Sequence, residues 1–153
     1  MDILGGYMAK ILVSNCLLGC ECRYKGDGML CERLVELAKY HTLIGVCPEQ
    51  MGGLSTPRDP AEIVGDKIIS SQGRDVTKQY MRGAQTALHI AKLNHVKYAI
   101  LKANSPSCGK GRIYDGTFSG NRIDGNGVTA ELLMKNGIKV FTEDEIDLIP
   151  LKK

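Results

Sequence analysis

Four short apolar runs recur along the chain and predict the strands of a buried sheet. They cover residues 10–14, 42–46, 98–101 and 138–141. Between them, three stretches with apolar residues at helical spacing predict amphipathic helices. The first stretch covers residues 30–40, the second follows a cap at Asp75 or Thr77 and runs to about residue 93, and the third covers 128–135 and ends at Asn136-Gly137. Thr142 and Glu145 have the spacing of a capping box, which predicts a last short helix.

The alternation of strands and helices predicts an α/β fold with right-handed crossovers between parallel strands. We expect a single-domain, three-layer α/β structure of the Rossmann/flavodoxin-like kind, with a mostly parallel four-stranded sheet. With the strands numbered along the chain, the expected order is 2-1-3-4, which puts the switch point between strands one and three. A chain of 153 residues suits one domain, 1–153, in which residues 1–7 form a dispensable extension before the first strand.

Two Pro- and Gly-rich regions separate these elements. Residues 47–60 predict a long irregular loop, and a loop of this length is usually functional. Residues 61–71 predict a small hairpin around Gly65-Asp66, and residues 113–120 predict a loop or a short hairpin. The Gly-rich stretches match neither the P-loop nor the dinucleotide fingerprint.

Composition narrows the class of function. With 20 basic and 17 acidic residues the net charge is +3, which is too balanced to favour general nucleic-acid binding. No apolar run approaches the roughly 18 residues that a membrane span needs, and the start lacks the layout of a signal peptide. We therefore expect a cytoplasmic protein, in which six cysteines are metal ligands or catalytic groups rather than disulfides.

Three of these cysteines follow predicted strands. Cys16, Cys47 and Cys108 come just after strands one, two and three, and the expected order brings them to one sheet edge, where ligands bind in open α/β sheets. Three thiolates without a fourth partner suit an iron–sulfur cluster with one open iron, which can act as a Lewis acid. The alternative is that one or two of them are buried structural cysteines.

A second, local set of thiols competes with this one. Cys16, Cys20 and Cys22 lie within one loop, and short cysteine spacing is itself a metal signal. Cys20 or Cys22 could therefore be an alternative ligand or a bystander. Cys31 opens a predicted helix and is expected to serve packing. His41, His89 and His95 lie at helix or strand positions away from the thiol edge and are not expected to bind metal.

Polar residues near the thiols are candidates for proton transfer. Glu49 follows Cys47 by two residues and could relay protons, or simply pair with Arg58. Ser105 and Ser107 flank Pro106, where a hydroxyl could hold a substrate heteroatom or only stabilise the turn. Four further side chains could line the mouth of such a site, or be ordinary surface groups: Arg23, Tyr24, Arg58 and Asp115.

Several motifs together resemble those of the DUF523 family, whose characterised members are thiouracil desulfidases. The motifs are Val13-Ser14-Asn15-Cys16-Leu17-Leu18-Gly19, Cys22-Arg23-Tyr24-Lys25-Gly26, Val46-Cys47-Pro48-Glu49-Gln50-Met51-Gly52-Gly53-Leu54 with Thr56-Pro57-Arg58, Asp75-Val76-Thr77, Gly83-Ala84, Ser105-Pro106-Ser107-Cys108-Gly109 and Gly127-Val128-Thr129-Ala130. They occur in order over residues 10–143. Asn15, where Ala is common, and the extra Cys20 depart from the family's pattern.

The resemblance implies a [4Fe-4S] cluster held by Cys16, Cys47 and Cys108. It implies that the fourth iron takes the sulfur of a small-molecule thiolated pyrimidine and that water replaces this sulfur without net redox change. It also implies assistance by Glu49 and by Ser105 or Ser107. The residues alone leave two other functions open, namely a non-enzymatic metal-binding or sulfur-sensing module and a metal-free cysteine-based sulfur transferase.

Overall fold

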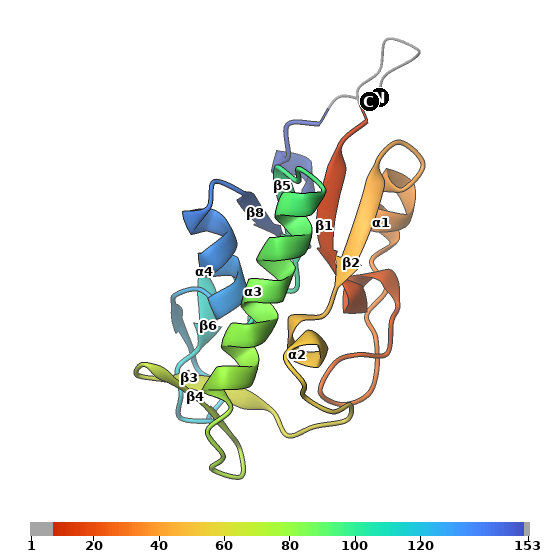
Figure 1. Cartoon of the computed structure of the whole chain (residues 1–153). Coiled ribbons are helices and arrows are strands. Elements are labelled where there is room, and N and C mark those ends of the chain that lie inside the picture. The colour runs from red at the N-terminus through yellow and green to blue at the C-terminus, as the bar shows by residue number, and fades with distance from the viewer. Residues whose placement is uncertain (1–7, 152–153) are drawn as a thin grey trace.

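A four-stranded parallel sheet forms the centre of the protein in a computed structural model that describes residues 8–151 (Figure 1). The proposed extension, residues 1–7, lies outside the described residues. The sheet order is β2-β1-β5-β8, which confirms the predicted 2-1-3-4. All neighbouring pairs are parallel, so every strand ends at the same edge. The strands are β1 (Lys10–Ser14), β2 (Thr42–Val46), β5 (Tyr98–Leu101) and β8 (Lys139–Thr142).

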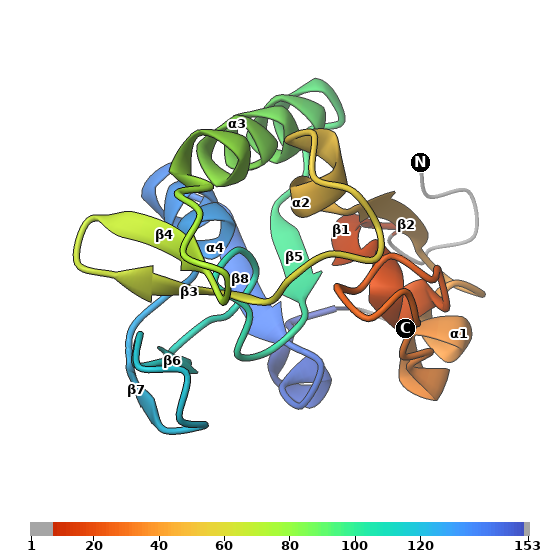
Figure 2. The same ribbon diagram turned by 90° about the horizontal axis from the view of Figure 1, so that it is seen from below.

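Side-chain alternation along the strands builds a separate core on each face of the sheet. On one face Leu12 of β1 packs with α3 (Thr77–Leu93) and α4 (Val128–Lys135). On the other face its neighbours Ile11 and Val13 pack with α1 (Glu32–Leu37) and the 3₁₀ turn η2 (Ile146–Leu148). Figure 2 shows the sheet between these two helical layers, as expected for a three-layer α/β fold.

The helix predictions hold in part. The predicted end of α3 at residue 93 and the predicted range of α4 are confirmed, but the N-cap of α3 is Val76 rather than Asp75 or Thr77. The helix predicted over residues 30–40 is wrong in length, because α1 has six residues and its flanks Leu30 and Tyr40 are exposed. The Thr142 amide donates to the Glu145 carboxylate at 3.0 Å, as in a capping box, but the Thr142 hydroxyl accepts from Asp144 instead.

Two antiparallel hairpins, each a separate two-stranded sheet, lie beyond the carboxyl edge of the parallel sheet. The predicted hairpin at Gly65-Asp66 is confirmed as β3 (Ala61–Val64) and β4 (Lys67–Ser70). The second pairs β6 (Arg112–Tyr114) with β7 (Arg122–Asp124), so residues 113–120 are part of a hairpin. Seen from below, both hairpins lie on the same side of the sheet edge (Figure 2).

The region 47–60 is not wholly irregular as predicted. Pro48–Met51 form a one-turn helix, α2, directly after β2, with Cys47 as its N-cap. Within residues 8–151, no helix has the length and apolar character needed to cross a membrane.

Candidate metal and active site

A cavity of about 380 Å³ opens at the carboxyl edge of the sheet. This volume lies in the range of small-molecule sites, roughly 300–1,000 Å³. Its wall carries four thiols, those of Cys16, Cys22, Cys47 and Cys108. The predicted convergence of the three strand-end thiols is therefore observed, and Cys22 joins them.

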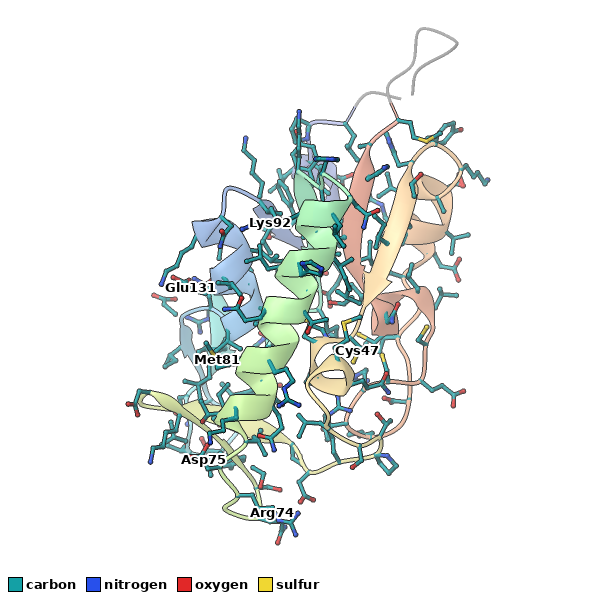
Figure 3. All side chains as sticks on the ribbon, in the orientation of Figure 1. Cys47, Arg74, Asp75, Met81, Lys92 and Glu131 are labelled. Atoms are coloured by element: carbon teal, nitrogen blue, oxygen red, sulfur yellow. The ribbon has the colours of Figure 1, made fainter. Side chains whose placement is uncertain are left out.

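Cys47 is placed by the junction of β2 and α2 (Figure 3). It has extended backbone, and Pro48 opens the helix at the position where a missing N–H costs nothing. The Cys47 thiol donates to the Cys22 carbonyl oxygen at 3.8 Å. This contact ties the end of β2 to the loop that follows β1.

Cys108 lies in a tight turn that rests on the first turn of α4. The Pro106 carbonyl accepts from the Val128 amide at 2.9 Å, and the Ser107 carbonyl accepts from the Thr129 amide at 2.8 Å. The free amides at a helix start are thereby satisfied by the turn itself. α4 thus fixes the turn that carries the third strand-end thiol.

The local trio of cysteines is divided by the structure. Cys16 and Cys22 are buried at the cavity wall, whereas Cys20 is exposed and does not line it. Cys31 is partly buried and packs against the core beneath α1. Two of the three thiols in this loop therefore line the cavity.

Burial raises the pKa of three thiols at the cavity, those of Cys16, Cys22 and Cys108. It raises the pKa of Cys16 to about 11, with the nearby Glu49 charge adding to the rise. It also raises the pKa of Cys108 well above its ordinary value. The pKa of Cys22 is raised first by burial and then by Cys47. Such thiols are poor free nucleophiles at neutral pH, because the thiolate is the reactive form.

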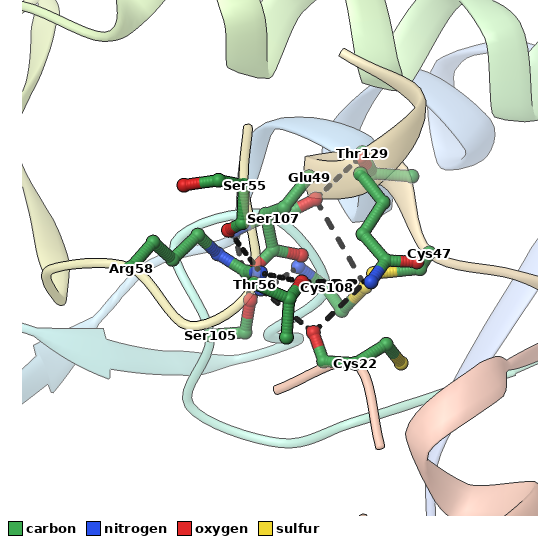
Figure 4. A network of polar contacts seen from close by, with 11 residues as sticks. Cys22, Cys47, Glu49, Ser55, Thr56, Arg58, Ser105, Ser107, Cys108 and Thr129 are labelled. Carbon is green, nitrogen blue, oxygen red and sulfur yellow. Dashed lines mark hydrogen bonds and ion pairs between the residues drawn. The ribbon is translucent and has the colours of Figure 1, made fainter. Parts of the chain in front are cut away.

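Glu49 and Arg58 form a largely buried ion pair beside the thiols (Figure 4). The Arg58 Nη2 lies 3.3 Å from the Glu49 Oε2 and also donates to the Cys22 carbonyl oxygen at 3.0 Å. Burial raises the pKa of Glu49, and the Arg58 guanidinium opposes that rise. Glu49 therefore pairs with Arg58, which is one of the two alternatives considered from the sequence, and it also lines the cavity.

The two candidate serines have different surroundings. The Ser105 oxygen accepts from the amides of Ser107 and Cys108, each at 3.0 Å, and Ser105 lines the cavity. With its oxygen so engaged, its hydroxyl proton is free to point toward a ligand. Ser107 does not line the cavity; it is fully buried and its hydroxyl pairs with that of Thr129 at 2.8 Å.

The rest of the wall comes partly from residues that the sequence singled out and partly from others. Of the four side chains considered for the mouth, Arg23, Tyr24 and Arg58 line the cavity, and Asp115 does not. The additional lining side chains include Glu62, Tyr80, Lys102, Asn104, Tyr114 and Phe118. Lys102 and Asn104 lie within three residues of the end of β5, closer than Cys108, so the sheet-edge rule that selected Cys108 would also have selected them.

The donor set fits an iron–sulfur cluster. Within residues 8–151, no three His, Cys, Asp or Glu side chains converge closely enough to hold one metal ion. In a cluster each thiolate binds a different iron, so the sulfur ligands surround a volume rather than meet at a point. Soft thiolates also select iron–sulfur clusters over hard cations. Buried thiols around one cavity meet these requirements.

Comparison with known proteins gives consistent matches over most of the chain. A family model described as 2-thiouracil desulfurase matches residues 11–145. Uncharacterized protein YbbK of Bacillus subtilis (strain 168) is 48% identical over 147 residues, which cover 90% of this chain and 97% of YbbK. A solved structure of the [4Fe-4S]-dependent thiouracil desulfidase TudS (DUF523Vcz) matches with a TM-score of 0.87 and 43% identity, covering 92% of this chain and 94% of that one.

Proposed function

Because this chain belongs to the 2-thiouracil desulfurase family, we propose that it is a desulfidase that converts a thiolated pyrimidine and water to the oxo-pyrimidine and hydrogen sulfide. The carbon–sulfur bond breaks, a carbon–oxygen bond forms, and no electrons are gained or lost. The observation that carries this proposal is the group of buried thiols beside a buried carboxylate on one cavity.

We assign Cys16, Cys47 and Cys108 as the residues that hold a [4Fe-4S] cluster. When bound by three thiolates, such a cluster supplies an open iron that acts as a Lewis acid toward the substrate's sulfur. The three thiols follow three strands that end at one edge of the sheet, and the turn that carries Cys108 is held in addition by the first turn of α4. Cys22 lines the same cavity and is the fourth thiol available there.

In this proposal, polar side chains of the cavity wall carry out the proton transfers. Glu49 accepts a proton from the attacking water, and Arg58 holds its carboxylate in place through Nη2. Ser105 donates its free hydroxyl proton to a heteroatom of the ring. Ser107 serves the turn rather than the reaction, because its hydroxyl is buried against Thr129.

The substrate is a small molecule in this proposal. A cavity of about 380 Å³ accommodates a single pyrimidine. We also propose a cytoplasmic location, because six cysteines without a disulfide among the described residues suit a reducing compartment.

The decisive experiment measures iron and turnover together under anaerobic conditions. Reconstituted protein is expected to hold about four irons per chain and to release uracil and sulfide from 2-thiouracil in equal amounts. Cys16→Ser, Cys47→Ser and Cys108→Ser are each expected to lose the cluster, whereas Cys31→Ser, outside the cavity, keeps it.

Two outcomes would contradict this assignment. Bound iron with no reaction of any thiolated pyrimidine would indicate a binding or sensing module. Desulfuration by iron-free protein that is abolished by alkylation of one thiol would indicate a cysteine-based sulfur transferase.

A further inference from the structure

Aromatic side chains are concentrated around the cavity. The chain has six Tyr, two Phe and no Trp, and four of these aromatic residues line the cavity: Tyr24, Tyr80, Tyr114 and Phe118. Tyr80 is buried in the core, and Phe118 is the most exposed of the four, with 41% of its surface accessible. Phe118 therefore has a ring surface that a ligand entering the cavity can cover.

Phe118 is also held in a strained conformation. Its φ angle is +56°, a left-handed value that is uncommon for bulky residues. Among the described residues only three non-glycine residues have positive φ, and two of them, Asn104 and Phe118, line the cavity. Strain of this kind persists only where the surroundings enforce it, and it concentrates at functional sites.

A buried carboxylate enforces the conformation of the Phe118 loop. The Glu62 Oε1 accepts from the amide of Gly116 at 2.9 Å and from the amide of Phe118 at 3.2 Å. Glu62 is only 8% exposed and belongs to β3, in the other hairpin. Gly116 has a φ of +92°, and a Cβ there would lie 2.7 Å from the Ile63 carbonyl oxygen. The loop is thus fastened directly against β3.

We propose that Phe118 is a specificity-determining residue that packs against the flat face of the pyrimidine ring, and that Glu62 is the positioning residue that holds it there. Phenyl rings stack on nucleobases without hydrogen bonds, and such stacking favours planar aromatic rings over puckered ones. Binding the face of the ring leaves its edge free for Ser105 and the reacting groups. This inference rests on the proposed function and deepens it.

The first test compares wild type with Phe118→Ala and Phe118→Tyr as reconstituted protein. We expect Phe118→Ala to raise KM for 2-thiouracil about tenfold while kcat stays within about twofold, and Phe118→Tyr to restore KM. The preference for 2-thiouracil over the non-aromatic 5,6-dihydro-2-thiouracil is expected to fall by about the same factor. Ile123→Ala, which changes an exposed residue of β7 outside the cavity, is the matched control.

A second measurement does not depend on turnover. Equilibrium dialysis with labelled uracil is expected to give a Kd about tenfold weaker for Phe118→Ala than for wild type. Equal uracil affinity and equal KM in the two proteins would overturn the inference even if wild type is an efficient desulfidase. A wild type that binds uracil through Phe118 yet releases no sulfide would instead contradict the proposed reaction and support the ring-binding role.

The role of Glu62 is tested by two substitutions. Glu62→Gln keeps a carbonyl oxygen as acceptor and is expected to change KM less than threefold. Glu62→Ala is expected to raise KM as Phe118→Ala does, and to add almost nothing when both changes are combined. If the double variant instead raises KM by the product of the two single-variant factors, Glu62 does not act through Phe118.

Discussion

At the scale of single residues, Glu49 and Arg58 place one negative and one positive buried charge beside the thiols. Their side chains are 16% and 7% exposed. Arg58 also contacts the Cys22 carbonyl and the Thr56 hydroxyl, the latter at 3.0 Å. One guanidinium therefore joins the loop after β1, α2 and the segment before β3. Removing one partner of such a pair commonly costs about 3–5 kcal/mol, because the other charge stays buried.

We predict that Glu49→Gln keeps its iron but loses turnover. The amide retains the shape and an oxygen that accepts from Arg58, but it cannot take a proton from water. General-base catalysis typically contributes about 10²–10⁴-fold, so kcat should fall at least about 100-fold. Stopped assays of sulfide release on reconstituted protein, with iron counts on the same samples, measure both quantities.

The matched control is Glu36→Gln, which removes an exposed carboxylate of α1 that pairs with Lys39. It should leave kcat unchanged. Full turnover of the Glu49→Gln protein with intact iron would remove Glu49 from the proton steps and leave it as a structural partner of Arg58.

At the scale of elements, α2 is held by close contact with α3. A Cβ added at Gly83 would overlap the Pro48 carbonyl oxygen, and one added at Gly52 would overlap the Gln79 carbonyl oxygen. These two glycines let the backbones of the two helices touch. Since α2 carries Glu49 and begins directly after Cys47, this contact positions both residues.

We predict that Gly83→Ala displaces α2 and weakens the site. Overpacking of this kind costs typically about 1–3 kcal/mol, which corresponds to roughly 2–12 °C in Tm for a chain of this size. Iron content should fall as well, because Cys47 moves with the helix. Gln85→Ala, at an exposed position of α3, is the control and should leave both values unchanged. Normal iron content in Gly83→Ala would show that Cys47 is fixed by β2 alone.

The elements that sequence predicted well are those with a repeated pattern. The 17 residues of α3 carry a full apolar stripe, and β1 is a run of buried residues. α2 was missed because one helical turn has no periodicity, and its Pro and neighbouring Gly residues also indicate a loop. The prediction over residues 30–40 exceeds α1 because Leu30 fits the helical spacing of the apolar positions but is exposed and lies outside the helix.

At the scale of the whole molecule, the parallel sheet explains why three distant cysteines could be predicted to meet. Parallel strands end at one edge, so a residue type that recurs after several strands must gather there. The mouth of the cavity could not be predicted in this way. It depends on contacts between hairpins, such as Glu62 with Phe118 across 56 positions, which no local pattern encodes.

The same geometry predicts that the cluster stabilises the entire fold. A cluster bound by Cys16, Cys47 and Cys108 connects the ends of β1, β2 and β5, and these thiols are brought together only in the folded chain. A ligand present at 100 times its Kd stabilises the folded state by about 2.7 kcal/mol, equivalent to roughly 5–10 °C in Tm here. Anaerobic calorimetry of reconstituted and chelator-treated protein should show this difference. Cys20→Ser, which changes the exposed thiol, should preserve it, whereas Cys16→Ser should abolish it. Equal Tm values for iron-loaded and iron-free wild type would mean that the iron is held outside these three strand ends.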